Sequence, residues 1–225
     1  MHGSECLEKL FENHVELIVK VRLLLFAWAK KNYSNFPWRN PKNQFHGLVA
    51  EIMLQRTKAE QVLPVYPLFV EKYSSPKDIV QDSESFLKLL EPLGLRWRNK
   101  EILNLCLALH KKGDRIPSRR KELLNLPGVG PYIADAYLSL HKGIRSSIID
   151  ANVVRLWGRI LGFETDNETR RKKWFIKLVD QITPEKNFKQ FNYAIIDFSR
   201  TVCGARPMCH TCTIASLCEF YRLSH

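Results

Sequence analysis

Four cysteines at short intervals are the feature that most restricts the fold of this chain. They are Cys203, Cys209, Cys212 and Cys218, in the spacing Cys-x5-Cys-x2-Cys-x5-Cys. Four thiolates on one turn-rich stretch can surround a single inorganic centre, and Gly204 and Pro207 supply turns within it. The residues alone leave three interpretations open: an iron–sulfur cluster, a zinc ion, or a set of buried free thiols or two disulfides.

The length and composition indicate a globular protein. A chain of 225 residues forms one large domain or two small ones, and a hydrophobic content of 45% supports a sizeable core. No apolar run reaches the roughly 18 residues of a membrane span, and acidic residues precede the first apolar run, unlike a signal peptide. We therefore expect a protein of the cytoplasm, associated with the nucleoid, in which the thiols stay reduced.

The net charge favours a polyanionic partner. Lys and Arg number 35 against 23 Asp and Glu, a formal charge of +12. Such an excess is typical of nucleic-acid binding, although a merely solubilising surface has the same composition. The basic residues gather in three clusters, at Arg96–Lys100, Lys111–Arg120 and Arg170–Lys173. Trp97, inside the first cluster, either stacks on a base or sugar or packs within the protein.

Apolar residues recur at helical spacing along almost the whole chain, and strand-like alternation is nearly absent. The predicted helices are 15–31, 46–55, 59–73, 83–90, 99–112, 119–125, 132–141, 152–161, 170–182 and 189–202. The sequence therefore predicts an all-α fold.

The segment Leu126–Tyr132 reads LPGVGPY between two predicted helices. Glycines at positions 128 and 130 make a tight turn whose backbone N–H groups, with the following helix N-terminus, can hold a phosphate. This is the helix-hairpin-helix pattern, although ordinary turns also contain Leu-Pro-Gly. Eighteen residues after Tyr132 comes Asp150, in SIIDANVVRL. Taken alone, Asp150 predicts only a helix N-cap.

The hairpin, Asp150 and the four cysteines together resemble the endonuclease III superfamily of DNA glycosylases. Further matching segments are Phe36–Arg39, Glu51–Thr57, Phe191–Asn192 and Asp197–Ser199. The resemblance implies two lobes: a six-helix barrel over residues 37–145, with the hairpin at about 119–141, and a cluster lobe built from residues 1–36 and 146–225. It also implies a 4Fe–4S cluster on the four cysteines rather than zinc. In relatives the first cysteine interval usually has six residues, whereas here it has five.

The resemblance assigns catalytic roles to three residues. Asp150 would stabilise the positive charge that develops on the sugar when the N-glycosidic bond breaks. Glu51 would contact or protonate the flipped base, unless it is a paired structural acid. Tyr132 stands where bifunctional relatives have a lysine that attacks the sugar, which implies a monofunctional enzyme.

The resemblance also implies a set of DNA-binding residues. They are Gln55, Arg56, Thr57, Arg96, Trp97, Gly128 and Gly130. The first three would lie on the loop that fills the gap left by the flipped nucleotide. The guanidinium of Arg56 matches the acceptors of a guanine opposite that gap.

The same resemblance predicts which base is excised. Arg56, Tyr132 and the segment Asp197–Ser199 resemble the thymine–guanine mismatch glycosylases, whereas adenine glycosylases carry Gln-Gln-Thr at the loop. We therefore predict a monomeric enzyme of base excision repair that removes thymine or uracil opposite guanine in double-stranded DNA. Three alternatives remain: an adenine glycosylase acting opposite 8-oxoguanine, a glycosylase for a bulky modified cytosine in foreign DNA, and a DNA-binding module without catalysis.

The pair His46-Gly47 is a second departure, because relatives tend to place bulkier aliphatic residues there. A small residue at position 47 predicts either an enlarged base pocket or a loosened helix start.

Overall fold

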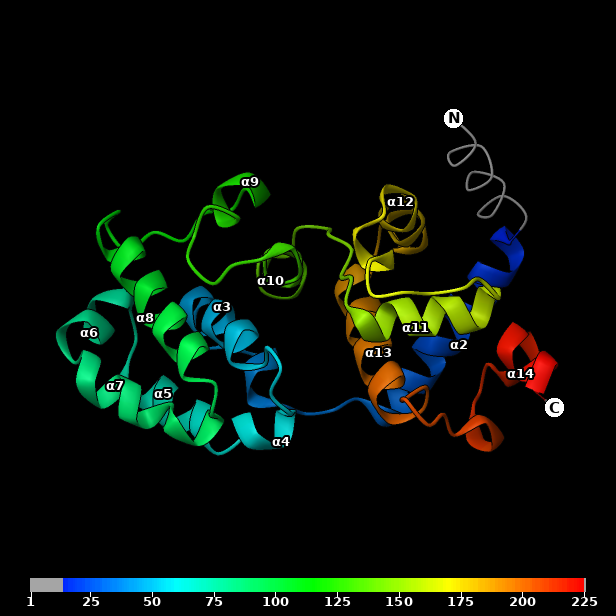
Figure 1. Cartoon of the computed structure of the whole chain (residues 1–225), viewed down its shortest axis with the longest axis horizontal. Coiled ribbons are helices and arrows are strands. Elements are labelled where there is room, and N and C mark those ends of the chain that lie inside the picture. Colours follow the sequence, from blue (N-terminus) through cyan, green and yellow to red (C-terminus); the bar gives the residue numbers. More distant parts are fainter. Residues whose placement is uncertain (1–13, 225) are drawn as a thin grey trace. The chain divides into compact units, whose positions relative to one another are not determined.

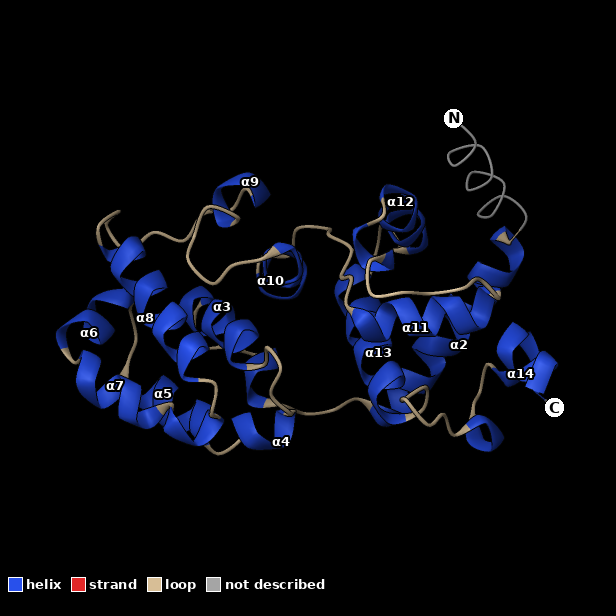
Figure 2. Ribbon diagram, in the orientation of Figure 1, coloured by secondary structure: helices blue, strands red, loops and turns tan. Residues whose placement is uncertain are grey.

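The computed structural model describes residues 14–224. All regular elements of these residues are helices, and no strand is found among them (Figure 2). This confirms the predicted all-α fold. No helix of the described part is both long enough and apolar enough to cross a membrane. The predicted cluster lobe also takes in residues 1–13, which lie outside the described residues.

The chain divides into two compact units, each with its own hydrophobic core (Figure 1). One consists of Asn35–Ile144. The other, discontinuous in sequence, combines the described residues up to Ser34 with those from Arg145 onward.

The continuous unit packs its helices around a core rich in aromatic residues. Its elements are η1 (Pro37–Arg39), α3 (Gln44–Met53), α4 (Ala59–Val62), α5 (Val65–Lys72), α6 (Pro76–Gln81), α7 (Ser83–Leu89), η2 (Glu91–Leu93), α8 (Arg96–His110), α9 (Arg120–Leu123), α10 (Pro131–Ala136) and η3 (Tyr137–His141). The helix predicted over 59–73 is two helices, and Pro64 lies between them. Helix α6 was not predicted, although Ser75 and Asp78 form a capping box at its start.

The end of α10 departs from regular α-helical geometry. The segment Tyr137–His141 is a π-helix, in which the N–H of Lys142 bonds to the carbonyl of Tyr137 at 3.1 Å. Such insertions rotate the residues that follow them around the helix axis. The π segment packs against α3, and this contact brings the two ends of the unit's sequence together.

The discontinuous unit is built around the pairing of an N-terminal helix with a C-terminal one. Its elements are α2 (Val15–Asn32), α11 (Ala151–Leu161), η4 (Thr169–Arg171), α12 (Lys173–Ile182), α13 (Phe188–Thr201), η5 (Cys209–Thr211), η6 (Ala215–Leu217) and α14 (Glu219–Ser224). Helix α2 packs against α13, and the fully buried Trp157 of α11 lies in the shared core. Helix α14, η5 and η6 were not predicted, because they are too short to show a periodic pattern. The helix predicted over 170–182 is α12 preceded by η4.

Candidate functional site

Glu51 is the buried carboxylate of the continuous unit. It lies near the end of α3 with 3% of its surface exposed. Its Oε1 atom is 2.7 Å from Nε2 of His141, whose side chain is completely buried. Burial, and secondarily the charge of Glu51, raise the pKa of the nearby Tyr66 phenol. The sequence had left open a paired structural acid at Glu51, and the structure supplies the partner, which lies 90 residues away and was not predicted.

The loop after α3 carries the three predicted gap-filling residues, and a buried arginine holds it. Arg98 is fully buried, and its Nη1 donates to the carbonyls of Met53 at 2.9 Å and Gln55 at 3.0 Å, and to the hydroxyl of Thr57. Its Nη2 reaches the carbonyl of Leu93 at 3.3 Å. Burial lowers the pKa of Arg98. Arg98 thus fixes the loop from inside the protein.

Arg56 is exposed on this loop, unlike Gln55 and Thr57. Its φ of 56° lies in the left-handed region, which is uncommon for a side chain of this size. The guanidinium carbon lies 6.0 Å from the ring centroid of Trp97, which is 47% exposed. Such a contact stabilises a cation over an aromatic face. The structure therefore brings two predicted DNA-binding residues together on the surface.

Of the two hairpin glycines, only Gly128 has a backbone conformation that favours glycine. Gly128 has a φ of 70°, and its missing Cβ would lie 3.1 Å from the Cβ of Glu101. Gly130 is the N-cap of α10, and an added Cβ there would meet nothing within 4 Å. A bidentate ion pair, with distances of 2.7 and 2.9 Å between Arg120 and Asp135, ties α9 to α10. Tyr132, in the first turn of α10, is half-buried.

Asp150 lies in the discontinuous unit as the N-cap of α11. Its Oδ1 accepts from the backbone N–H of Val153 at 2.8 Å, and its Oδ2 accepts from the side-chain amide of Asn152, also at 2.8 Å. The N-cap prediction is therefore confirmed. Both oxygens are held in place while the side chain remains half-exposed. This fixes the carboxylate without removing it from solvent.

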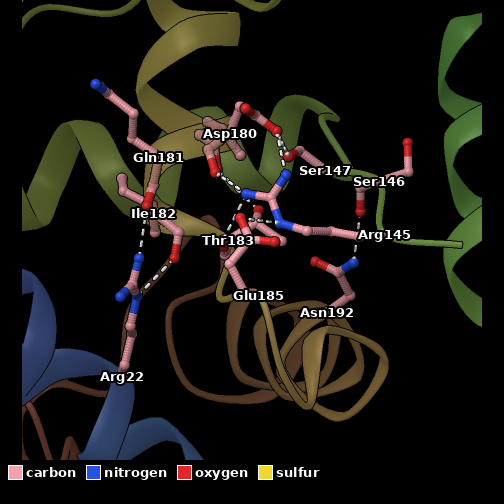
Figure 3. A network of polar contacts seen from close by, with 11 residues as sticks. Arg22, Arg145, Ser146, Ser147, Asp180, Gln181, Ile182, Thr183, Glu185 and Asn192 are labelled. Atoms are coloured by element: carbon pink, nitrogen blue, oxygen red, sulfur yellow. Dashed lines mark hydrogen bonds and ion pairs between the residues drawn. The ribbon is translucent and has the colours of Figure 1, made fainter.

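A polar network anchors the segment that leads into Asp150 (Figure 3). Nη1 of Arg145 is 2.9 Å from the Asp180 carboxylate, and its Nη2 donates to the Thr183 carbonyl at 2.8 Å. Ser147 donates to the same Asp180 carboxylate at 3.1 Å, and Asn192 donates to the Ser146 carbonyl at 3.0 Å. The C-terminal end of α12 and Asn192 of α13 thereby hold the segment that precedes α11.

The four cysteines line one pocket of the discontinuous unit. Its remaining walls are mostly apolar and include Leu156, Phe198 and Ile214. Burial raises the pKa of the Cys212 and Cys218 thiols. The donor set of four thiols fits the cluster that the sequence resemblance implies, but no group of three or more His, Cys, Asp or Glu side chains in residues 14–224 has the arrangement to hold a metal ion.

Two arginines of α11 connect this pocket to the helix that Asp150 caps. Arg155 donates to the Cys203 carbonyl at 3.0 Å. Arg159 donates to the Gly204 carbonyl at 2.7 Å and lies 3.5 Å from the Cys203 sulfur. Neither arginine was predicted. One helix thus has Asp150 as its N-cap and makes the contacts to the cysteine loop farther along.

The basic clusters contribute less free charge than the sequence suggested. In the cluster Arg96–Lys100 the central Arg98 is buried and structural. In the cluster Arg170–Lys173, Arg171 pairs with Glu168 at 2.8 Å and Lys172 pairs with Asp166 at 2.7 Å.

Comparison with known proteins identifies the family. The model for the HhH-GPD superfamily base excision DNA repair protein matches residues 49–180. The chain belongs to this superfamily. It is 32% identical to a thymine/uracil-DNA glycosylase of Methanothermobacter thermautotrophicus, over 90% of this chain and 93% of that protein. It is 34% identical to a thymine-DNA glycosylase of Aeropyrum pernix, over 91% and 95% of the two chains.

A solved structure agrees with these sequence relatives. The structure of a thermostable thymine-DNA glycosylase matches this HhH-GPD protein with a TM-score of 0.86 and 29% identity, over 92% of this chain and 98% of that one. The suspected superfamily, and the similarity to thymine glycosylases within it, are therefore confirmed.

Proposed function

We propose that this protein is a monofunctional DNA glycosylase that removes thymine or uracil opposite guanine during base excision repair. The observation that carries this proposal is the similarity, over nine-tenths of the chain, to two proteins named as thymine glycosylases. The exposed Arg56 supports it, because a guanidinium can bind both O6 and N7 of an opposite guanine.

In the proposed reaction the Asp150 carboxylate stabilises charge on the sugar. Breaking the N-glycosidic bond develops positive charge on the deoxyribose ring, and an adjacent carboxylate stabilises that charge. The hydrogen bonds from Val153 and Asn152 hold the Asp150 side chain, so little reorganisation is needed when the charge appears. Glu51 serves the flipped base, as an acceptor or through a proton on its carboxyl group.

We also propose that the enzyme does not cut the strand. A strand-cutting relative needs an amine to form a Schiff base with the sugar, and Tyr132 has none. The product is then an intact strand with an abasic site, which alkali converts into a break.

The four cysteines are proposed to hold a 4Fe–4S cluster. When bound, such a cluster would cross-link the loop from Cys203 to Cys218 and complete the fold around it. Purified protein should absorb broadly near 400 nm, whereas a zinc protein would not. In the same proposal the continuous unit is the barrel lobe, the other is the cluster lobe, and the protein acts as a monomer in the cytoplasm.

The decisive experiment measures base release under single-turnover conditions, followed by alkali. Duplexes carrying thymine–guanine, uracil–guanine, adenine–8-oxoguanine and a bulky modified cytosine should be compared. Faster release of thymine or uracil than of the other bases supports the proposal. Faster release of adenine overturns the assignment of the base, and release from none of the duplexes favours a DNA-binding module.

Borohydride trapping tests the second part of the proposal. We expect no covalent protein–DNA adduct and no strand break before alkali. Efficient trapping would show that another amine of the chain replaces the lysine of bifunctional relatives.

A further inference from the structure

In the continuous unit, the His141 imidazole fills the space that a side chain at position 47 would need. A Cβ added to Gly47 would lie 2.7 Å from Cγ and 2.8 Å from Nδ1 of the His141 imidazole, closer than real side chains approach. Gly47 is inside α3 with a backbone conformation that any residue adopts, so no turn requires a glycine there. Glycine also weakens a helix interior. The imidazole is therefore what makes a side chain at position 47 unfavourable.

The same imidazole reaches Glu51, one helical turn after Gly47 on α3. The Nε2–Oε1 distance of 2.7 Å is that of a strong hydrogen bond, and both side chains are buried. The π segment that ends at His141 brings the ring to this position. Three unusual features thus converge on one carboxylate: a glycine inside a helix, a π-helical turn and a buried histidine.

The second ring nitrogen indicates which atom carries the proton. Among the described residues, Nδ1 of His141 is buried and has no hydrogen-bond partner. A proton on Nδ1 would leave a buried N–H donor unsatisfied. The tautomer with its proton on Nε2 avoids this, and it donates that proton to Oε1 of Glu51. His141 is then the donor and Glu51 the acceptor.

We propose that His141 is a positioning residue that orients the Glu51 carboxylate toward the target base, and that Gly47 provides the space for its imidazole. This inference rests on the proposed glycosylase function. With Oε1 held by the imidazole, the rotation of the carboxyl group is fixed. Without the imidazole, Glu51 samples other rotamers, and the bound base meets a correctly oriented carboxylate only part of the time.

His141 would also be expected to be buried if the pair were merely structural. Both interpretations predict that His141→Ala lowers the melting temperature. Only the positioning role predicts that the protein that remains folded binds mismatched DNA normally and releases the base slowly. The test therefore separates the single-turnover rate constant from the Kd.

Four variants form the test, assayed on a thymine–guanine duplex well below their melting temperatures. We expect His141→Ala to lower the rate constant at saturating enzyme by about tenfold to a hundredfold, with the Kd within about twofold of the wild type. His141→Gln keeps an N–H donor on a long side chain, and we expect it to recover part of the loss. Gly47→Ala should slow release, because its methyl group displaces the imidazole.

The double variant, Gly47→Ala with His141→Ala, gives the sharpest result. Once the imidazole is gone, the added methyl group has nothing to displace, so the two losses should not add. Additive losses would show that Gly47 acts independently of His141. His110→Ala is the matched control, because His110 also pairs with a carboxylate, at 3.1 Å from Asp114, on the exposed end of α8. It should leave the rate constant unchanged.

The outcomes separate this inference from the proposed function. An active wild type with a His141→Ala rate constant within twofold of it overturns the positioning role and leaves the glycosylase function intact. A loss that appears only in the Kd also overturns it. A wild type that releases no base from any duplex refutes the glycosylase function itself.

Discussion

The two units hold their candidate catalytic carboxylates by opposite means. In the continuous unit Glu51 is 3% exposed, and its partner His141 comes from the far end of the unit. In the discontinuous unit Asp150 is half-exposed, and it accepts hydrogen bonds from residues two and three positions ahead. One carboxylate depends on tertiary packing and the other on the local geometry of a helix start.

This difference matches the proposed targets of the two carboxylates, the flipped base for Glu51 and the sugar for Asp150. A base-recognising group must exclude water and hold one orientation, and burial among packed helices achieves that. A carboxylate that stabilises charge on a sugar needs access to the DNA backbone, and an N-cap holds it at the surface. Variants of buried residues in the continuous unit should therefore have the largest effect on stability, whereas variants of the N-cap Asp150 should mainly change turnover.

The largest effect on stability is expected for Arg98→Met. The variant fills similar space but leaves the carbonyls of Met53, Gln55 and Leu93 without their donor. We expect it to lower the free energy of unfolding by about 3 kcal/mol, as measured by urea denaturation. Arg120→Met is the control, because Arg120 forms a half-exposed pair with Asp135 and should lose about 1 kcal/mol or less. Equal losses would contradict the role of Arg98 as a buried clamp.

The largest effect on turnover is expected for Asp150→Asn. Asparagine caps a helix as well as aspartate does, so the bond to Val153 and the fold should persist. Loss of the negative charge should slow base release by about 10²-fold or more, equal to about 2.7 kcal/mol, while duplex affinity is retained. Asp166→Asn, which changes an aspartate at a comparable turn of the same unit, should leave turnover unchanged. An unaltered rate for Asp150→Asn would favour a non-catalytic module.

The same contrast explains what the sequence could predict. Asp150, the hairpin glycines and most helices follow local rules of capping, turn conformation and periodicity, and all were found from the sequence. His141 was not, because nothing near it in sequence marks a partner 90 residues away. The unusual glycine at position 47 was noticed, but the reason for it was not found. Only the folded chain brings the His141 imidazole beside Gly47. Arg98 was read as surface charge because its cluster is basic, whereas the fold buries it.

A smaller effect is expected for Arg145→Gln, which loosens the segment leading into Asp150. The variant loses the ion pair to Asp180 and weakens the contact with the Thr183 carbonyl. We expect a loss of about 1 kcal/mol in stability and a several-fold slower base release. Arg22→Gln is the control: Arg22 bonds to the carbonyls of Gln181 and Ile182 at the same end of α12, but not to that segment (Figure 3). It should lose similar stability with unchanged release, and slower release from both variants would contradict a specific role for Arg145.

The smallest effect is expected in the salt dependence of DNA binding, which should differ between the basic clusters of the two units. Each phosphate contact adds about 0.9 to the slope of log affinity against log salt concentration, so six contacts predict a slope of about −5 for undamaged duplex. Arg96 is exposed in the continuous unit, so Arg96→Gln should reduce the magnitude of the slope by about 0.9. Arg171 is already paired with Glu168, so Arg171→Gln should change the slope much less. Fluorescence anisotropy over a series of salt concentrations measures both. A larger change for Arg171→Gln would mean that DNA displaces Glu168, and that the discontinuous unit makes the stronger phosphate contacts.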